Sequence, residues 1–347
     1  MNIIFVILLS IYGIFAADPP YGQLSVKGSQ LVGSDGKPVQ LRGMSMYWSQ
    51  WMPQWWTDDT VEAAKCCFNS NVIRATMAVD FDGYLTHPDE ELKKLDIIVQ
   101  EAIKLGIYVL IDWHTDSTFQ AQAVEFFGKM AKKYAGVSNV LYEDYNEPRK
   151  VDWDKDLVPY HTAVVNAIRE SDKKNVIILG TPEWSQDVDV AAKNPVKGDN
   201  LMYTLHYYSG THTQWLRDKA QAAIDKGLPI FITEYGTCTA DEKGTFTKDE
   251  AEAWYKFSEK NKLSYINWAL DDKKENAAAF KPGTKPVLAE MCKDSNLTQS
   301  GNFVQDYYKA LDNGVKCGAK TTGSTTPAPP TTPLMPTTST LPKKMSA

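Results

Sequence analysis

The sequence predicts an α/β fold, specifically a (β/α)₈ barrel with a small N-terminal β-hairpin. Eight short apolar runs alternate with helical patterns along the 347-residue chain, which is the repeat of such a barrel. Each run is continuously apolar, as in parallel strands that are covered on both faces. The alternative, a doubly wound open sheet, often carries a glycine-rich nucleotide loop after its first strand, and none follows the first run here.

The elements are expected in the following order. A hairpin at 22–39, with turn dipeptides Lys27-Gly28 and Asp35-Gly36, is expected to plug the bottom of the barrel. The eight strands are expected at Leu41–Met46, Val72–Met77, Ile107–Trp113, Val140–Asn146, Val176–Gly180, Leu201–Tyr207, Ile230–Tyr235 and Tyr265–Leu270. The clearest helix runs from Pro88 to Gly106, with acids in its first turn and glycine at its end; similar patterns predict helices at Leu157–Glu170 and Lys248–Lys260.

The two ends of the chain differ from its middle. Residues 1–16 form an apolar run that ends near Ala16 and Ala17, which predicts a signal peptide and a secreted, extracellular protein. This run is too short to span a bilayer. Residues 319–347 are rich in Thr, Pro and Ser and are expected to form a disordered, linker-like tail. The folded domain is therefore expected at 17–318.

Charge and composition exclude some partners. The net charge is −6 and the pI is near 5.5, so we expect no nucleic acid partner, because phosphate binding needs a basic face. We also expect no membrane partner and a monomer. The chain holds ten Trp and seventeen Tyr, which suit both core packing and stacking on sugar rings.

An oxidising compartment permits disulfides among the five cysteines. Five is an odd number, so one thiol remains if two bridges form, and the sequence leaves the pairing open. Cys66 and Cys67 are adjacent and cannot easily bridge each other, whereas Cys292 and Cys317 could clamp the last helix. No Cys/His spacing resembles a zinc site, so no zinc ion is expected. Asn296-Leu-Thr298 is a possible glycosylation sequon.

Polar residues gather at the carboxyl ends of the expected strands, where barrel enzymes build their sites. They are Arg74, His114, Asn146, Glu147, His206, Tyr208, Glu234 and Trp268. Burying so many polar groups at one end of a barrel is unfavourable unless they pair with each other or with a ligand. A lone histidine such as His114 would more often be a satisfied core residue, but the whole set is hard to explain as core.

Two carboxyl groups at such strand ends are suited to cleaving a glycosidic bond, with Glu147 and Glu234 as the pair. One must be a protonated acid, which requires a raised pKa, and the other must stay ionised as nucleophile. Arg74 and a tyrosine hydroxyl can keep the nucleophile ionised. Asn146 can bind the sugar 2-hydroxyl, and Trp268 can form the floor on which the sugar stacks.

The chain resembles glycoside hydrolase family 5, and within it the subfamily 2 endo-β-1,4-glucanases, most closely the secreted cellulases of plant-feeding invertebrates. The resemblance covers about Tyr21 to Cys317. Its motifs are Tyr21-Gly-Gln-Leu-Ser-Val-Lys-Gly, Leu41-Arg-Gly-Met-Ser, Val72-Ile-Arg-Ala, Ile111-Asp-Trp-His, Asn146-Glu-Pro, Trp184-Ser-Gln-Asp, Leu205-His-Tyr-Tyr, Thr233-Glu-Tyr-Gly and Ile266-Asn-Trp-Ala. Asn-Glu-Pro alone is a modest signal, but the ordered set is specific.

The resemblance implies a retaining glycosidase on a (β/α)₈ barrel that needs no cofactor and hydrolyses β-1,4-glucan. It implies Glu147 as acid/base and Glu234 as nucleophile, the latter held by Arg74 and Tyr208. The further roles that it implies are Asn146 on the 2-hydroxyl, His114 and His206 lining the −1 sugar site, Trp268, Lys273 and Glu275 at the minus subsites, Trp184 on the plus side and Trp51 on the outer minus side.

Three departures from the family pattern concern the substrate. Tyr47 stands where many relatives carry His, Ala78 stands where an aromatic often stacks a sugar, and the loop after His114 is short. They leave open an alternative, an endo-β-1,4-xylanase or a mixed glucan, xylan and mannan specificity. A second alternative is a non-catalytic carbohydrate-binding protein, but no residue of the catalytic set is missing.

Overall fold

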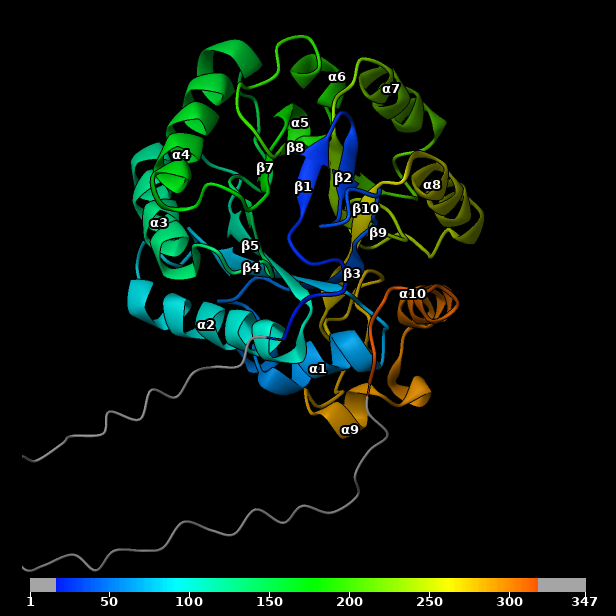
Figure 1. Cartoon of the computed structure of the whole chain (residues 1–347). Helices are drawn as coiled ribbons and strands as arrows, with labels where there is room; N and C mark the ends of the chain where they lie inside the picture. The colour runs from blue at the N-terminus through cyan, green and yellow to red at the C-terminus, as the bar shows by residue number, and fades with distance from the viewer. Residues whose placement is uncertain (1–16, 318–347) are drawn as a thin grey trace, which may run out of the picture. The chain divides into compact units, whose positions relative to one another are not determined.

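The computed structural model describes residues 17–317. The expected signal peptide at 1–16 and the expected tail at 319–347 both lie outside this range. Within it, eight parallel strands close into a barrel in the order β10-β3-β4-β5-β6-β7-β8-β9, as the sequence predicts (Figure 1). The strands are β3 Arg42–Met46, β4 Val72–Ala78, β5 Tyr108–His114, β6 Val140–Glu143, β7 Ile177–Leu179, β8 Leu201–Tyr208, β9 Ile230–Gly236 and β10 Ser264–Leu270.

Helices surround the barrel (Figure 1). They are α1 Asp58–Cys66, α2 Pro88–Leu105, α3 Gln120–Tyr134, α4 Val158–Ser171, α5 Pro182–Ser185, α6 Val188–Ala191, α7 Gln214–Asp225, α8 Lys248–Asn261, α9 Leu288–Met291 and α10 Gln299–Lys309, with shorter turns at Pro53–Trp55, Trp153–Leu157 and Asp294–Asn296. Helix α2 follows the expected pattern: Pro88 is its first residue and acids fill its first turn. It ends at Gly106, whose φ of 69° is a left-handed conformation that glycine adopts without strain.

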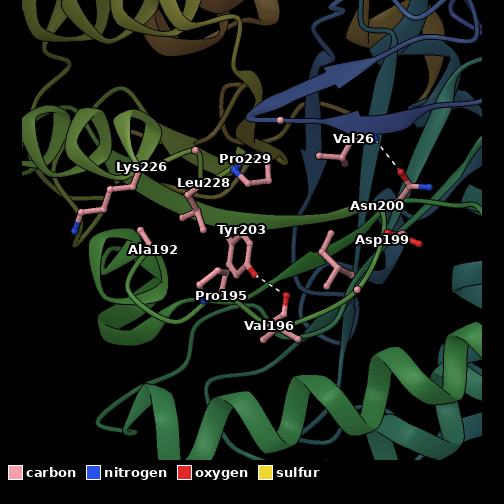
Figure 2. A pocket seen from close by; sticks show the side chains of 14 residues that line it. Val26, Ala192, Pro195, Val196, Asp199, Asn200, Tyr203, Lys226, Leu228 and Pro229 are labelled. Atoms are coloured by element: carbon pink, nitrogen blue, oxygen red, sulfur yellow. Dashed lines mark hydrogen bonds between the residues drawn. The ribbon is translucent and has the colours of Figure 1, made fainter.

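The N-terminal hairpin, β1 Ser25–Lys27 with β2 Gln30–Val32, lies against the amino-terminal end of the barrel. Leu24 and Leu31 join the apolar cluster inside the barrel. The Val26 amide donates to Asn200 Oδ1 at 2.9 Å. Beside this contact is a hollow of about 290 Å³, which Figure 2 shows lined by Tyr203, Leu228 and Pro229 among others. It holds no pair of acids, and it lies at the end of the strands opposite to the predicted site.

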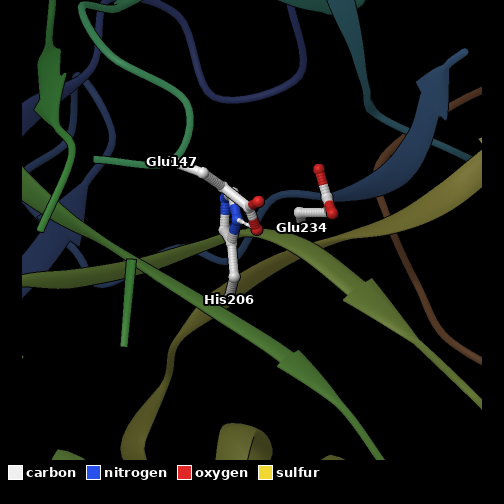
Figure 3. A group of neighbouring side chains, drawn as sticks. All are labelled: Glu147, His206 and Glu234. Carbon is white, nitrogen blue, oxygen red and sulfur yellow. Dashed lines mark hydrogen bonds and ion pairs between the residues drawn. The ribbon is translucent and has the colours of Figure 1, made fainter. Parts of the chain in front are cut away.

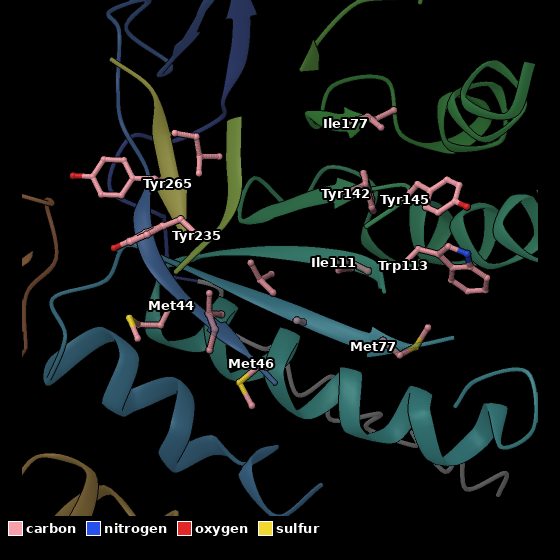
Figure 4. Packing of buried hydrophobic residues seen from close by; sticks show 14 of the residues in the cluster. Met44, Met46, Met77, Ile111, Trp113, Tyr142, Tyr145, Ile177, Tyr235 and Tyr265 are labelled. Atoms are coloured by element: carbon pink, nitrogen blue, oxygen red, sulfur yellow. The ribbon is translucent and has the colours of Figure 1, made fainter. Parts of the chain in front are cut away.

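The core consists of two layers that follow the alternation of each strand. Met44 and Met46 of β3 and Ile111 and Trp113 of β5 belong to the large cluster shared with the helices (Figure 4). The intervening residues point into the barrel. At the amino-terminal end these inward residues are apolar; they include Val72, Leu110, Leu141, Ile178, Met202, Phe231 and Ile266. The next inward-pointing residues along the strands are polar, and they form the base of the predicted site.

Strand β6 is shorter than the expected Val140–Asn146, because its ladder ends at Glu143. The chain then leaves the sheet. The Asn146 amide donates to the Trp113 carbonyl at 3.3 Å, and the Glu147 amide donates to the Thr115 carbonyl at 3.2 Å. Glu147 therefore lies on a connecting segment held against the end of β5, not on a strand.

The sequence left the disulfide pairing open, and the possible pair Cys292 with Cys317 is not formed. Cys292 pairs with Cys67, 225 residues away, and their Cα atoms are 5.2 Å apart. Cys66 is also disulfide-bonded, and Cys238 is a buried free thiol. Proximity brings Cys67 and Cys292 together, because α1 packs against α9. Among residues 17–317, no helix has the length and apolar character needed to cross a membrane.

Candidate active site

A cleft of about 470 Å³ lies at the carboxyl ends of the barrel strands. Its lining comes from segments far apart in the sequence: Trp48, His114, Asp116, Asn146, Glu147, Trp184, Gln186, His206, Tyr208, His212, Glu234, Ala240, Asp241, Glu242 and Trp268. Seven of these, together with the buried Arg74 beneath them, are the residues at the strand ends that the sequence singled out. The parallel barrel explains their meeting, because the carboxyl ends of all eight strands are at the same end.

Glu147 and Glu234 face each other across this cleft, with His206 beside Glu147 (Figure 3). Oxygen atoms of the two carboxyl groups and a ring nitrogen of His206 all lie within 4.8 Å of one another. Glu234 is on β9 and His206 is on its neighbour β8, where the two residues are paired in register. The short separation between the carboxyl groups leaves no room for a water molecule plus a sugar carbon between them.

Arg74 is fully buried beneath the cleft and organises its acidic groups. Its Nη1 donates to Glu234 Oε2 at 2.7 Å, and its Nε donates to Glu143 Oε2 at 2.7 Å. Nη2 donates to Asn146 Oδ1 at 2.7 Å and lies 3.0 Å from Asp112 Oδ2. A buried guanidinium is tolerated when its donors are satisfied by acceptors that include anions, and here three strands, β5, β6 and β9, and the segment after β6 supply them.

Glu234 is held as a carboxylate. Burial by itself would raise its pKa, but the charges of His206 and Arg74 and the hydrogen bond from Tyr208 lower the pKa below its ordinary value. The Tyr208 hydroxyl donates to Oε1 at 2.7 Å, while Arg74 occupies Oε2. Both oxygens are therefore oriented by donors that favour the ionised form.

Glu147 has the opposite character. Burial and the nearby Glu234 charge raise its pKa to about 7, although the hydrogen bond with His206 opposes the shift. His206 Nδ1 lies 2.9 Å from Glu147 Oε1. Burial would lower the pKa of His206, but the Glu234 charge and hydrogen bonds to Glu143 and Glu147 raise it to about 9. Below pH 7, therefore, the imidazolium donates from Nδ1 to Oε1, and the other oxygen of Glu147 is left to carry the acid proton.

A relay of hydrogen bonds fixes the orientation of His206. The Thr233 hydroxyl donates to Glu143 Oε1 at 2.6 Å. This hydroxyl must therefore accept from His206 Nε2, which lies 2.9 Å away. Glu143 remains ionised for this purpose: burial would raise its pKa, but Arg74 and His206 lower the pKa to about 2.

His114 is neutral by contrast. Burial and the Arg74 charge lower its pKa to about 3. Its Nδ1 lies 2.7 Å from Asp112 Oδ2, which also forms an ion pair with Arg74, so we assign the proton to Nδ1 and leave Nε2 as an acceptor. The ring stacks on Trp268, with centroids 5.4 Å apart, and meets the Trp48 ring edge-on at 4.2 Å.

Trp268 forms one floor of the cleft, and its position is fixed by contacts with Glu242 and Tyr47. Its Nε1 donates to Glu242 Oε1 at 2.8 Å, and its ring contacts Tyr47 at 5.1 Å. Lys273 is hydrogen-bonded to the Tyr47 hydroxyl and lies 2.7 Å from Glu275 Oε2. Lys273 and Glu275 therefore support the Tyr47 side of the floor; they do not line the cleft itself.

Aromatic rings mark two opposite sides of the barrel mouth. Trp48 and Trp51 follow β3, and Trp184 follows β7. In the closed strand order, β3 and β7 are four steps apart in either direction, so these rings lie across the mouth from each other. Trp51 is on the rim beyond Trp48, with ring centroids 4.8 Å apart. The backbone amide of Trp184 donates a hydrogen bond to the Pro148 carbonyl, and the Arg149 guanidinium lies 5.2 Å from the centroid of the Trp184 ring. These two contacts fix the position of Trp184.

Glu147, His206 and Glu234 have the residue types of a metal site, but their surroundings disfavour a cation. Both oxygens of Glu234 are already bound by Arg74 and Tyr208, and His206 is bonded to Glu147 and Thr233. The guanidinium 2.7 Å from Glu234 would repel a metal ion. The arrangement suits proton transfer and nucleophilic attack better than metal binding.

Several residues of the site were not predicted from the sequence. Asp112, Glu143 and Thr233 hold the residues beneath the cleft, and Trp48, Asp116, Gln186, His212, Asp241 and Glu242 line it. Period-two alternation was the signal for two of them. Asp112 lies two residues before His114, and Glu143 lies two after the inward Leu141, so both point into the barrel toward the buried Arg74.

A family model described as "Cellulase (glycosyl hydrolase family 5)" matches residues 32–274. The endoglucanase of Clostridium saccharobutylicum is 44% identical over 314 residues, which are 89% of this chain and 68% of that protein. Endoglucanase Z of Dickeya dadantii is 39% identical over 311 residues, 88% of this chain and 70% of that protein. These relatives are bacterial, and they do not bear on the expected resemblance to invertebrate enzymes.

Solved structures agree with this comparison. A protein from Cytophaga hutchinsonii superimposes with a TM-score of 0.81 at 46% identity, covering 84% of this chain and 95% of that one. The catalytic domain of Thermobifida fusca endoglucanase Cel5A superimposes with a TM-score of 0.78 at 32% identity, covering 83% of this chain and 98% of that one. The chain therefore belongs to the cellulase family of glycosyl hydrolases, family 5.

Proposed function

We propose that this protein is an endo-acting β-1,4-glucanase that cleaves cellulose-type polysaccharide by double displacement, with retention at the anomeric carbon. The observation that carries the mechanism is the separation of the two carboxyl groups, with oxygens within 4.8 Å of each other. Retaining enzymes place their carboxyl groups about 5–5.5 Å apart, whereas inverting enzymes need about 6.5–9.5 Å.

In the first step Glu234 attacks the anomeric carbon while Glu147 gives its proton to the leaving glycosidic oxygen. A glycosyl ester forms on Glu234, and the released sugar carries the new hydroxyl. Tyr208 and Arg74 orient the attacking carboxylate. Arg74 also fixes Asn146, whose amide nitrogen is then free to donate to the sugar 2-hydroxyl.

In the second step Glu147, now a carboxylate, removes a proton from water, and the water oxygen attacks the glycosyl ester. This restores Glu234 as a carboxylate and Glu147 as an acid. The acid that serves the first step becomes the base of the second because its pKa near 7 suits both roles. His206, bonded to Oε1, keeps the other oxygen directed to the substrate.

Glucan as the substrate is supported by the relatives. The proteins from Clostridium saccharobutylicum and Dickeya dadantii are endoglucanases, and a variant of the Thermobifida fusca catalytic domain has been solved with cellotetraose. Trp268 and Trp184 both line the cleft with the catalytic pair, and we propose that they offer stacking faces for sugars on the two sides of the cut. Rings on both sides suit attack within a polymer.

We also propose a subfamily 2 enzyme that is secreted and monomeric and has no membrane partner. Its catalytic domain spans 17–318, between a signal peptide at 1–16 and a linker-like tail at 319–347. The apolar leader of the sequence supports secretion, and so does the Cys67–Cys292 disulfide, because disulfides persist in oxidising compartments. Ordered motifs such as Thr233-Glu-Tyr-Gly support the subfamily.

The test is to compare initial rates of the purified protein on β-1,4-glucan, xylan and mannan at matched concentration, with Glu234→Gln as the blank. Glucan should be hydrolysed fastest. Xylan or mannan ahead of glucan would favour the second candidate, a xylanase or mixed enzyme, which Tyr47 and Ala78 suggest. Binding without hydrolysis of any polymer would contradict the enzymatic proposal altogether.

A further inference from the structure

Asp144 and His161 form a buried hydrogen-bonded pair that the proposed mechanism does not use. Both side chains are fully buried, and His161 Nδ1 lies 2.7 Å from Asp144 Oδ2. The other ring nitrogen, Nε2, lies 2.9 Å from the Gly180 carbonyl oxygen. A carbonyl oxygen only accepts hydrogen bonds, so Nε2 carries a hydrogen, and one more hydrogen is shared between Nδ1 and the Asp144 carboxyl group. The imidazole ring therefore bridges two segments of the chain through two hydrogen bonds.

The two segments that this bridge joins both carry residues of the cleft. Asp144 begins the connecting segment after β6 and lies three residues before Glu147. Gly180 directly follows β7 and lies four residues before Trp184. The two backbones already touch at this point, because a Cβ atom on Gly180 would lie 2.3 Å from the Tyr145 carbonyl oxygen. The bridge therefore fixes the segment of Glu147 against the end of the neighbouring strand.

Helix α4 supplies the bridge from outside the barrel. Glu143 points inward to Arg74, whereas the next residue, Asp144, points outward to His161 on α4. Tyr160, the residue before His161, adds a second bond, because its hydroxyl donates to the Asp144 carbonyl at 2.8 Å. Helix α4 thus fixes both the backbone and the side chain of the residue at which the chain leaves the sheet.

Burying this pair is unfavourable unless a defined geometry is required. Burial raises the pKa of Asp144, although the charge of His161 opposes the shift. Within residues 17–317, the second oxygen of this carboxyl group, Oδ1, has no hydrogen-bond partner. Apolar residues of similar volume often stabilise a fold as well as a buried polar pair does, or better. The pair therefore contributes a fixed position of the chain more than folding free energy.

We propose that Asp144 and His161 are positioning residues for the catalytic acid, and that their bridge keeps Glu147 directed at the glycosidic oxygen. This proposal rests on the proposed function, in which Glu147 is the acid. Proton transfer needs the two heavy atoms within about 2.6–3.2 Å, so a small displacement of the segment is enough to impair it. Glu234 is on β9, outside the bridged segments. Loss of the bridge should therefore impair acid catalysis and leave nucleophilic attack largely intact.

The experiment measures kcat/KM of the full chain on aryl β-cellobiosides whose phenol leaving groups differ in acidity. This parameter reports the first step, in which a good leaving group departs with little help from the acid and a poor one needs it. General acid catalysis contributes about 10²–10⁴-fold in all, so its partial loss in His161→Leu should lower kcat/KM about tenfold for the poorest leaving group. For the best leaving group the loss should be less than about twofold.

Two further variants separate positioning from folding. Val164→Ala truncates a buried residue of α4 outside the bridge, so it should reduce stability without any dependence on the leaving group. Asp144→Asn is the conservative variant. Its amide nitrogen can donate to Nδ1 of a neutral His161 ring, whose Nε2 still donates to Gly180, so most of the activity on poor leaving groups should remain. Asp144→Leu should behave like His161→Leu.

The outcomes are distinct. Equal losses for good and poor leaving groups in His161→Leu would overturn the positioning role and reduce the pair to a structural one. An Asp144→Asn variant as impaired as Asp144→Leu would also overturn it. If the leucine variants do not fold, His161→Gln, which can keep one of the two hydrogen bonds, provides the same comparison with a smaller expected loss. No hydrolysis of any cellobioside or glucan by the unchanged protein would instead overturn the proposed function.

Discussion

At the scale of single residues, Arg74 explains more of the site than either catalytic candidate. It contacts Glu143, Glu234 and Asn146, which come from distant parts of the chain, and it fixes the ionised state of the first two. The pKa values of the two carboxyl groups differ because Glu234 is next to the Arg74 cation, whereas Glu147 is next to the Glu234 anion. Their pKa values are thereby driven apart, which is how one acid and one nucleophile arise from two identical side chains.

The pKa shifts predict a bell-shaped pH profile. Activity needs Glu147 protonated, so kcat/KM should fall tenfold per pH unit above about pH 7, the pKa of that group. It also needs Glu234 ionised, so kcat/KM should fall at acid pH only below the ordinary range of a glutamate, because the pKa of Glu234 is lowered. Initial rates between pH 3 and 9 measure both limbs. An alkaline limb that persists unchanged in Glu147→Gln would contradict the assignment.

Thr233 is predicted to be a positioning residue acting through His206. Thr233→Val removes the acceptor for Nε2 and weakens protonation of the ring, so the pKa of Glu147 should rise and the alkaline limb should move to higher pH. We expect kcat to fall about tenfold, because a neutral His206 would draw the acid proton toward Nδ1.

Thr233→Ser keeps the hydroxyl and serves as the matched control. The pH profile distinguishes this role from a structural one, since a merely destabilised protein would lose active molecules without any movement of the limb. Identical profiles for the valine and serine variants would show that the relay has no part in catalysis.

The residues at the strand ends could be found from the sequence, but their supports could not. His114, Asn146 and Tyr208 end or directly follow apolar runs, and such positions meet at one end of any parallel barrel. Arg74 was found as a charged residue inside such a run. Asp112 and Glu143 are inside those runs, whose nearly continuous apolar character masks the alternation of inward and outward side chains along a strand. Glu242 and Trp48 are on connecting segments, whose paths depend on tertiary contacts that no local pattern records.

At the scale of elements, the strands were predicted well because continuous β-branched and aromatic runs have few alternative structures. The boundaries differ most at β6, where Tyr142-Glu143-Asp144-Tyr145 looks like strand but departs from the sheet after Glu143. The departure is driven by contacts outside the segment: the Tyr160 hydroxyl donates to the Asp144 carbonyl at 2.8 Å, and His161 binds the Asp144 carboxylate at 2.7 Å.

Strand packing gives a stability prediction at Gly43 of β3. A Cβ atom there would lie 1.9 Å from the Val72 carbonyl oxygen of β4, a backbone atom that cannot move aside easily. Gly43→Ala should destabilise the protein by about 3 kcal/mol. Thermal or urea unfolding measures the change.

Gly128→Ala in α3 is the matched control. Nothing lies within 4 Å of the Cβ that it would gain, and alanine is favoured over glycine inside a helix. We expect it to stabilise by about 0.5–1 kcal/mol. Equal effects of the two substitutions would mean that β3 and β4 can separate more readily than their packing indicates.

At the scale of the whole molecule, the Cys67–Cys292 disulfide joins the first barrel helix to the segment before the last one. It closes a loop of 225 residues, which restricts the unfolded chain more than a short loop would. Replacing both residues by serine should lower stability by about 2–5 kcal/mol. Unfolding midpoints measure this; Cys238→Ala, which removes the buried free thiol, should change stability by much less. A midpoint unaffected by the double replacement would contradict the prediction.

The rings across the barrel mouth, with Trp51 and Trp184 on opposite sides, have a consequence for the material that the protein acts on. A polysaccharide chain that is bound from one side of the barrel mouth to the other is cleaved in its interior. Each cleavage therefore shortens a long molecule greatly while it creates a single new reducing end. The viscosity of a solution of a soluble cellulose derivative should therefore fall rapidly at a stage when almost no reducing sugar has been released.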